Sequence, residues 1–424
     1  MSKLNIWVSG TCAATLESQQ GDFSLSYTED WAQSREAYAF SPHLPFKQTT
    51  QGAAVKHFFS NLLPEGRPLE ALSSAHQVSQ YDVFGILRKV GRDCAGALVI
   101  TDEDAPPPEA KIFAEQDYEE VSRAELHERI VDSRAQDVPL MFWRGKRRMS
   151  LPGVQNKLGV YMAQNDGLWL PKDGAPTSHI LKIGNARFPD IAANEYACMK
   201  LAKSIGLPVP DVQYMELPEP ILLVQRYDRT WTPDGGLLRT HQIDACQALN
   251  LPPEQKYEEP AYETAPPGPN FAQLLALHTL CRIPASAQVL MLQWLMFNYI
   301  IGNSDAHAKN FSFIVSEKGM EAAPLYDLVS GMRYALTDMA QTIGGETHAA
   351  VIGAAEWRQL AKDCSIAFAL LQRIGKQMVQ RIQNQSDKLK SQLLPEATHI
   401  HQATMQYVLA LADERSKLLN EQLQ

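Results

Sequence analysis

Short runs of alternating apolar and polar residues fill the first hundred positions of the chain. Residues 6–8, 23–27 and 96–100 alternate with the two-residue period of half-buried strands. Between them, residues 53–62 and 82–90 carry apolar positions three and four residues apart, which is the spacing of an amphipathic helix. The pattern predicts an N-terminal region in which strands and helices are mixed.

The middle of the chain keeps the strand pattern. Residues 102–108 are acidic and rich in proline, which is typical of an exposed connector. Strands are then expected at 158–162, 178–183 and 222–227, with one helix at 191–204. This part therefore predicts a sheet with a helix inserted between its strands.

Beyond residue 229 the apolar spacing becomes helical, apart from a proline-rich irregular loop at 252–269. Helices are expected at 241–249, 271–280, 289–301, 356–390 and 398–419. The segment 289–301 is almost wholly apolar and predicts a buried helix. The pattern as a whole predicts a C-terminal lobe made only of helices.

Composition narrows the class of protein. A chain of 424 residues has room for two or three domains, and a hydrophobic content of 45% is typical of a folded protein. No apolar stretch is long enough to span a membrane, and no signal peptide is visible. The six scattered cysteines fit reduced thiols in the cytoplasm. A net charge of −9 argues against direct binding of nucleic acid and favours a basic partner.

A polar turn directly after the apolar segment 289–301 carries the strongest candidate chemistry. Residues 302–310 read GNSDAHAKN, and a second carboxylate follows at Asp327. Asp305, Asn310 and Asp327 have the order of the groups that kinases use. One carboxylate accepts the proton of the substrate hydroxyl, while an Asn and a second carboxylate bind the metal. The alternative is an ordinary surface turn, because Asn, Ser, Asp and Gly are common turn residues.

Two upstream features bear on that choice. Residues 150–157 (SLPGVQNK) place Gly153 and Lys157 just before a strand, where backbone N–H groups and a positive charge suit phosphates. An ordinary basic hairpin is the alternative. Lys182 in a strand and Glu195 in the next helix follow the order of the kinase pair that positions the phosphates. Each also fits a surface role. The order of all these groups along one chain favours a kinase.

Together these motifs resemble the HipA-like serine/threonine kinase toxins. The matching motifs are Ser150-x-x-Gly153-x-Gln155-x-Lys157, 179–182 (HILK), 194–196 (NEY), 225–229 (QRYDR), 302–310 and 326–328 (YDL). Residues 58–65 (FFSNLLPE) and 90–97 (VGRDCAGA) resemble the N-terminal domain of that family. The resemblance spans residues 50–335, which is most of the chain.

The resemblance implies an α+β, bilobal protein-kinase-like fold with a mixed α/β N-terminal region and an all-α C-terminal lobe. It divides the chain into three parts: a HipA N-terminal domain at 1–108, a kinase N-lobe at 109–228 and a helical C-lobe at 229–424.

The implied cofactors are ATP and Mg²⁺, with Asp305 as the catalytic residue and Asn310 and Asp327 as metal ligands. The nucleotide-binding candidates are Ser150, Gly153, Val154, Gln155, Lys157, Lys182, Glu195, Gln225, Tyr227, Asp228, His307 and Lys309. Backbone groups at 225–227 would meet adenine, although relatives tend to carry an acidic residue at the position of Gln225. The alternative for this segment is a plain sheet strand.

Ser150 is also a candidate regulatory phosphosite. Kinases of this family phosphorylate a serine in this loop, one molecule acting on another, and the modification shuts the enzyme down. A dianion there would repel the phosphates of ATP and compete for Lys157. The alternative is a serine hydroxyl that braces the turn.

The resemblance further implies a HipB-like helix-turn-helix antitoxin as partner, so that DNA is contacted only indirectly. The implied protein substrate is an aminoacyl-tRNA synthetase, whose phosphorylation arrests growth. Cytoplasmic location and no membrane partner are expected. Two other functions stay open: a catalytically weak, kinase-like co-repressor scaffold, and a small-molecule kinase.

Overall fold

The computed structural model describes residues 2–46, 49–105, 113, 115–136, 138–143, 146–147, 156–162, 167–172, 174–185, 187–217, 219–233, 235–260 and 264–424. Two compact units make up the chain. The first holds residues 1–186, 223–253 and 313–320, and the second holds residues 187–222, 254–312 and 321–424. Each unit is described by itself.

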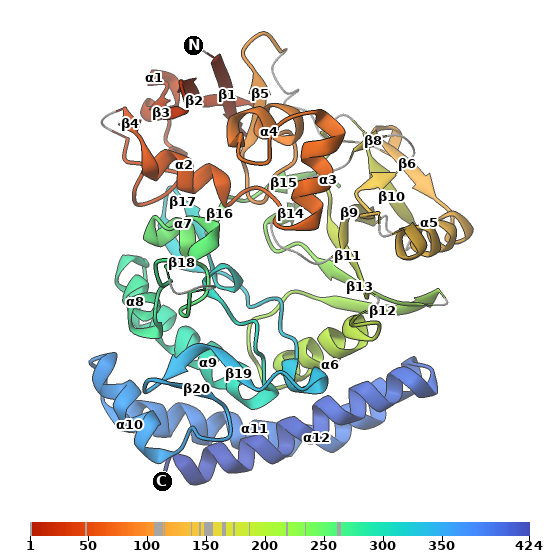
Figure 1. Ribbon diagram of the computed structural model, residues 1–424, viewed down its shortest axis with the longest axis vertical. Coiled ribbons are helices and arrows are strands. Elements are labelled where there is room, and N and C mark those ends of the chain that lie inside the picture. The colour runs from red at the N-terminus through yellow and green to blue at the C-terminus, as the bar shows by residue number, and fades with distance from the viewer. Residues whose placement is uncertain are drawn as a thin grey trace. The chain divides into compact units, whose positions relative to one another are not determined.

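An antiparallel sheet with the strand order β4-β3-β2-β1-β5 opens the first unit (Figure 1). Its strands are β1 Ser2–Val8, β2 Thr11–Gln19, β3 Asp22–Tyr27, β4 Thr50–Gln51 and β5 Val99–Asp102. Along β1, Leu4, Ile6 and Val8 are buried while the residues between them are less so. The alternation in the sequence therefore gives this sheet one face toward the core. The helices of this region are α1 Glu29–Gln33, α2 Ala53–Ser60, α3 Arg67–His76 and α4 Val83–Val90.

The strands of the six-stranded second sheet that lie wholly in the first unit have the order β11-β9-β10-β6. They are β6 Tyr118–Val121, β9 Lys157–Met162, β10 Leu168–Pro171 and β11 His179–Ile183. The antiparallel register of β9 and β11 sets Lys157 directly opposite Lys182. The remaining elements of this unit are α5 Arg123–Gln136, β7 Phe142–Trp143, β8 Lys146–Arg147, β14 Arg229–Trp231, β15 Leu237–Arg239, β16 Gln242–Asp244 and α7 Ala245–Leu249.

Packed helices form the core of the second unit, where α6 and α9 contact the long pair α11 and α12 (Figure 1). The helices are α6 Ile191–Ser204, α8 Phe271–Ala276, α9 Pro284–Ile301, α10 Ala354–Asp363, α11 Phe368–Leu393 and α12 His399–Gln422. Helix α9 begins at Pro284 and ends at Gly302, whose φ of 63° is left-handed and suits glycine. Nearly every residue of its last three turns is buried, so the loop that follows is mounted on a rigid support.

Short strands and single turns complete the chain. The strands are β12 Val212–Leu217, β13 Glu219–Gln225, β17 Ser312–Ser316, β18 Gly319–Ala322, β19 Asp338–Ile343 and β20 Glu346–His348. The 3₁₀ helices are Glu115–Asp117, Pro253–Gln255, Leu277–Leu280, Ala308–Asn310, Gly331–Tyr334 and Leu394–Glu396. In the part of the chain that is described, no helix combines the length and apolarity needed to cross a membrane.

The mixed α+β class and most expected elements are confirmed, but the C-terminal region is not all-helical. Strands β14 to β20 lie within residues 229–424. The expected helix at 241–249 starts only at Ala245, because Asp244 caps it and the three residues before are a strand. The expected single helix at 356–390 is two helices, separated where Ser365 adopts a left-handed φ of 53°. The two units do not follow the three expected domains, whose boundaries stay predictions.

Candidate active site

The loop after α9 is fixed by the side chain of Asn303. Its amide nitrogen donates to Oδ1 of Asn298 at 2.9 Å and to the backbone carbonyl of Asp327 at 3.3 Å. Its side-chain oxygen accepts from the backbone N–H of Asp305 at 2.9 Å. One buried side chain thus ties together the helix, the candidate base and the second candidate metal ligand, which are separated in the sequence.

Asp305 presents an exposed carboxylate on a buried support. Its side chain is 62% exposed, whereas His307, Lys309 and Asn310 are each 6% exposed. The amide nitrogen of Asn310 donates to the backbone carbonyl of Asp305 at 2.6 Å. The step of five residues from Asp to Asn therefore closes a ring that fixes the backbone of Asp305 and leaves its carboxylate accessible.

Asp327 lies beside this loop with a left-handed φ of 52°. The hydroxyl of its neighbour Tyr326 donates to the backbone carbonyl of Lys309 at 2.7 Å. A non-glycine residue in this conformation stores local strain, which structures retain where the side-chain direction matters. Together with the Asn303 contact, this bond fixes the Asp327 segment to the loop that carries Asp305 and Asn310.

Helix α6 also holds the segment that follows Asp327. Asn194 donates to the carbonyl of Ser330 at 2.9 Å and accepts from its N–H at 2.8 Å. Both groups are buried. This reciprocal pair sets the path of the chain just after Asp327, and it comes from the residue next to Glu195, which is also buried on α6.

His307 is a neutral structural side chain beside Asp305. Burial drives the pKa of His307 well below its ordinary value, and the cations of Lys256 and Lys309 lower the pKa further. Its Nε2 lies 3.9 Å from the Asp305 carboxylate, and its ring meets the ring of Tyr257 edge to face at 4.9 Å. A group that resists protonation does not compete with Asp305 for a proton.

The donor set fits magnesium. Asn310 and Asp327 offer oxygen ligands, and no group of three or more His, Cys, Asp or Glu side chains suited to a metal occurs among the described residues. Magnesium is commonly held by one or two protein side chains and completed by phosphate oxygens and water, whereas zinc needs three or four nitrogen or sulfur ligands.

In the first unit, the pairing of β9 with β11 brings two candidate phosphate ligands together. Lys157 and Lys182 are directly opposite each other, so their side chains leave the sheet on the same face. Lys182 is only 4% exposed. Like charges in such a pair are unfavourable by themselves. Ser150, Gly153, Val154 and Gln155 lie outside the described residues.

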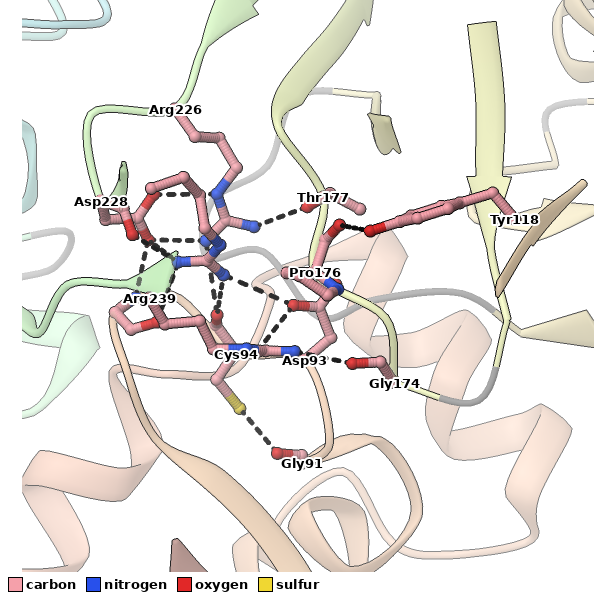
Figure 2. Close-up of polar contacts among 12 residues, drawn as sticks. Gly91, Asp93, Cys94, Tyr118, Gly174, Pro176, Thr177, Arg226, Asp228 and Arg239 are labelled. Atoms are coloured by element: carbon pink, nitrogen blue, oxygen red, sulfur yellow. Dashed lines mark hydrogen bonds and ion pairs between the residues drawn. The ribbon is translucent and has the colours of Figure 1, made fainter. Parts of the chain in front are cut away.

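The segment 225–229 ends β13 and enters a buried ionic cluster (Figure 2). The carboxylate of Asp228 accepts from Arg226 at 2.6 and 2.9 Å, from Arg229 at 2.9 Å and from the N–H of Gly96 at 2.8 Å. Burial alone would raise the pKa of Asp228, but the two guanidinium groups outweigh burial and hold the pKa well below its ordinary value. The carboxylate is therefore ionised and enclosed by protein donors.

Asp93 extends this cluster into the N-terminal region. It accepts from Arg239 at 3.1 Å and from Arg229 at 3.5 Å. Figure 2 shows the two aspartates on either side of the arginines, with Cys94 and Thr177 among the further acceptors. The cluster thus joins the 91–96 turn to the chain that leaves β13, and the other candidate there, Tyr227, donates through its hydroxyl to Gln242.

Comparison with known proteins decides the family. Residues 149–387, more than half of the chain, match the model of the HipA-like C-terminal domain, and residues 4–101 match the model of the HipA N-terminal domain. The chain belongs to the HipA family. It is a HipA-like kinase toxin, as the motifs predict.

Individual HipA relatives agree with this assignment. The serine/threonine-protein kinase toxin HipA of Shewanella oneidensis is 35% identical over 316 residues, which are 73% of this chain and 70% of that protein. The protein Y4mE of Sinorhizobium fredii is 35% identical over 376 residues, 87% of each chain. The structure is also similar to a chain in the Shewanella oneidensis complex of HipA, HipB and operator DNA, with a TM-score of 0.83 and 28% identity. The match covers 98% of the present chain and 96% of the chain in that complex. The kinase-like α+β fold is thereby confirmed.

Several residues of this HipA site are assigned no role from the sequence. Asn303, Asn194 and Tyr257 act through hydrogen bonds to Asp327, Ser330 and Asp305. The first two stand inside the matching motifs but have no assigned role there. The roles of the individual site residues stay predictions, and the structure groups Asp305, Asn310 and Asp327 in the second unit.

Proposed function

We propose that this HipA family chain transfers the terminal phosphate of ATP to a serine or threonine hydroxyl of a protein. The observation that carries the proposal is the exposed Asp305 carboxylate on a loop where Asn303 and Asn310 are buried and their side chains hydrogen-bond to the backbone of Asp305. A surface turn needs no such support, whereas a group that must meet a substrate hydroxyl does.

Each residue has a separate task in the transfer. Asp305 orients the attacking hydroxyl and accepts its proton as the oxygen bonds to phosphorus and the bond to ADP breaks. Lys157 and Lys182 bind phosphate oxygens on the face of β9 and β11, and Glu195 is the orienting partner of the kinase pair. Asn310 and Asp327 hold Mg²⁺, which supplies charge neutralisation on the phosphates when bound. Because the transition state is loose, positioning and electrostatics supply most of the rate.

The Shewanella oneidensis complex of HipA, HipB and operator DNA supports a protein partner for this chain. The partner is a HipB-like, helix-turn-helix antitoxin, and DNA is bound through that partner because this chain carries a net charge of −9. The protein substrate is an aminoacyl-tRNA synthetase, and Ser150 is the site of inactivating autophosphorylation. Fluorescence anisotropy with operator DNA tests the partner: the chain alone should not bind, and the chain with its antitoxin should.

Phosphopeptide mass spectrometry after treatment with Mg²⁺ and ATP tests the reaction itself. We expect phosphate on Ser150 of the wild type and none on Asp305→Asn, while calorimetry shows that both bind ATP. ATP binding without any phosphoprotein product would contradict the kinase assignment and favour the co-repressor scaffold. Phosphate transfer to small alcohols alone would favour a small-molecule kinase.

A further inference from the structure

The loop between α7 and α8 is rich in proline and has no part in the reaction as described so far. Lys256 and Glu258 are nevertheless bonded to other segments of the second unit, and Tyr257 between them is bonded within the loop. The carbonyl of Lys256 accepts from the N–H of Ala308 at 3.0 Å, and the carbonyl of Tyr257 accepts from Gly268 at 3.0 Å. Glu258 accepts from the N–H and hydroxyl of Thr342 at 2.7 and 2.8 Å.

One side chain within residues 256–258 contacts the candidate base Asp305. The hydroxyl of Tyr257 donates to Oδ1 of Asp305. The ring of Tyr257 is held between two neighbours, since His307 meets it at 4.9 Å and the Lys256 ammonium lies 5.4 Å from its centre. Tyr257 is 37% exposed, so its hydroxyl lies at the surface where the carboxylate also meets solvent.

We propose that Tyr257 is a positioning residue for phosphoryl transfer, which holds the Asp305 carboxylate in the orientation that accepts the substrate proton. The inference rests on the proposed kinase function. An aspartate side chain that is 62% exposed has room for more than one rotamer, and only some rotamers face a substrate hydroxyl. A hydroxyl donor whose two sequence neighbours are each hydrogen-bonded to other segments favours one of these rotamers before the substrate arrives.

The hydrogen bonds that hold residues 256–258 argue against a mobile gate over Asp305. A gate would need a segment free to leave Asp305, but Lys256 and Glu258, on either side of Tyr257, are bonded to Ala308 and Thr342 in other segments of the second unit.

Tyr257→Phe tests the proposal, because it keeps the ring against His307 and removes only the hydroxyl. The assay measures transfer from ATP to the inactive Asp305→Asn chain as acceptor protein. We expect kcat to fall roughly 10- to 100-fold, the range for losing a hydrogen bond to a charged group. The KM for ATP should stay unchanged.

Tyr214→Phe is the matched control. Its hydroxyl donates to Oε1 of Glu216 at 2.7 Å in the same unit, so the same chemistry is removed away from the catalytic loop. We expect this variant to keep the wild-type kcat and the wild-type KM for ATP.

Three outcomes would overturn the inference. An unchanged kcat in Tyr257→Phe would mean that the hydroxyl does not position Asp305. A higher kcat would mean that the hydroxyl competes with the substrate. A rise in the KM for ATP together with a lower melting temperature would mean that Tyr257 only packs the loop. If the wild type itself transfers no phosphate, the proposed kinase function fails, and this result is distinct from all three.

Discussion

Asp228 and Asp305 both stand in short polar motifs next to basic residues, yet their surroundings are opposite. The side chain of Asp228 is 4% exposed and accepts from two arginines and a backbone N–H. The side chain of Asp305 is 62% exposed, its backbone is held by Asn303 and Asn310, and its carboxylate accepts from the Tyr257 hydroxyl. The charge of Asp228 is buried among cationic side chains, whereas the charge of Asp305 is exposed to solvent.

The difference distinguishes a carboxylate that stabilises the fold from one that is accessible to a substrate. A buried carboxylate surrounded by guanidinium groups is costly to disturb, because removing one partner leaves the others unpaired in a medium of low polarity. An exposed carboxylate contributes little to stability but can exchange its solvent for a substrate. We therefore assign Asp228 to the assembly of the first unit and Asp305 to the reaction, and the following predictions test that separation.

Asp305→Asn should have the largest effect on rate. Loss of a general base costs about 100- to 10,000-fold in kcat, while an exposed substitution changes the free energy of unfolding by less than about 0.5 kcal/mol. Phosphate incorporation and thermal unfolding measure the two quantities. A variant with nearly normal kcat would remove Asp305 from the mechanism.

Asp228→Asn should have the largest effect on stability. Breaking a buried ion pair costs about 3 to 5 kcal/mol, and denaturant unfolding should show a loss of that order. Asp211→Asn is the matched control, because the Asp211–Lys203 pair is more than half exposed and should contribute less than about 1 kcal/mol. If Asp228→Asn kept its stability but lost ATP binding, Asp228 would return to the nucleotide site.

The catalytic loop could be predicted from the sequence because its determinants are local. The apolar run of α9, the glycine that ends it and the five-residue step from Asp305 to Asn310 all lie within about one loop and one helix. The match of α6 to the expected residues 191–204 has the same origin.

The ionic cluster could not be predicted, because its members are distant in the sequence. Asp93 and Arg229 are 136 positions apart, and only the fold brings them together. The motif 225–229 therefore favours a nucleotide-binding role for Asp228 when read alone. The break between α10 and α11 was missed for a related reason: the left-handed residue there is Ser365, not the glycine or proline that usually marks a helix end.

Gly331→Ala should produce an intermediate effect on kcat through the loop that carries Asp305. A Cβ atom at Gly331 would lie 2.0 Å from the hydroxyl oxygen of Ser304, which directly precedes Asp305. Overpacking of this kind costs about 1 to 3 kcal/mol, so we expect a shifted loop, a lower kcat and a lower melting temperature. Adding Ser304→Ala removes the closest atom and should restore part of the rate. No rescue in the double variant would mean that the clash with the Ser304 hydroxyl is not the cause of the lower rate.

His241→Gln should have the smallest effect, and only in acid. Burial lowers the pKa of His241 to about 4, although the Phe40 carbonyl and the nearby Asp228 charge oppose that shift. The unfolded chain binds the proton near pH 6.5, so between pH 6.5 and 4 the unfolded state holds more protons than the folded one. The stability that neutral His241 contributes is therefore complete above pH 6.5 and is lost as the pH falls, by up to about 1 kcal/mol per unit. Urea unfolding at several pH values should show a shallower acid slope in His241→Gln, while the exposed His348→Gln should keep the wild-type slope. An unchanged slope in both variants would mean that His241 does not resist protonation in the folded chain. The contrast with Asp305 would then rest on Asp228 and Asp93 alone.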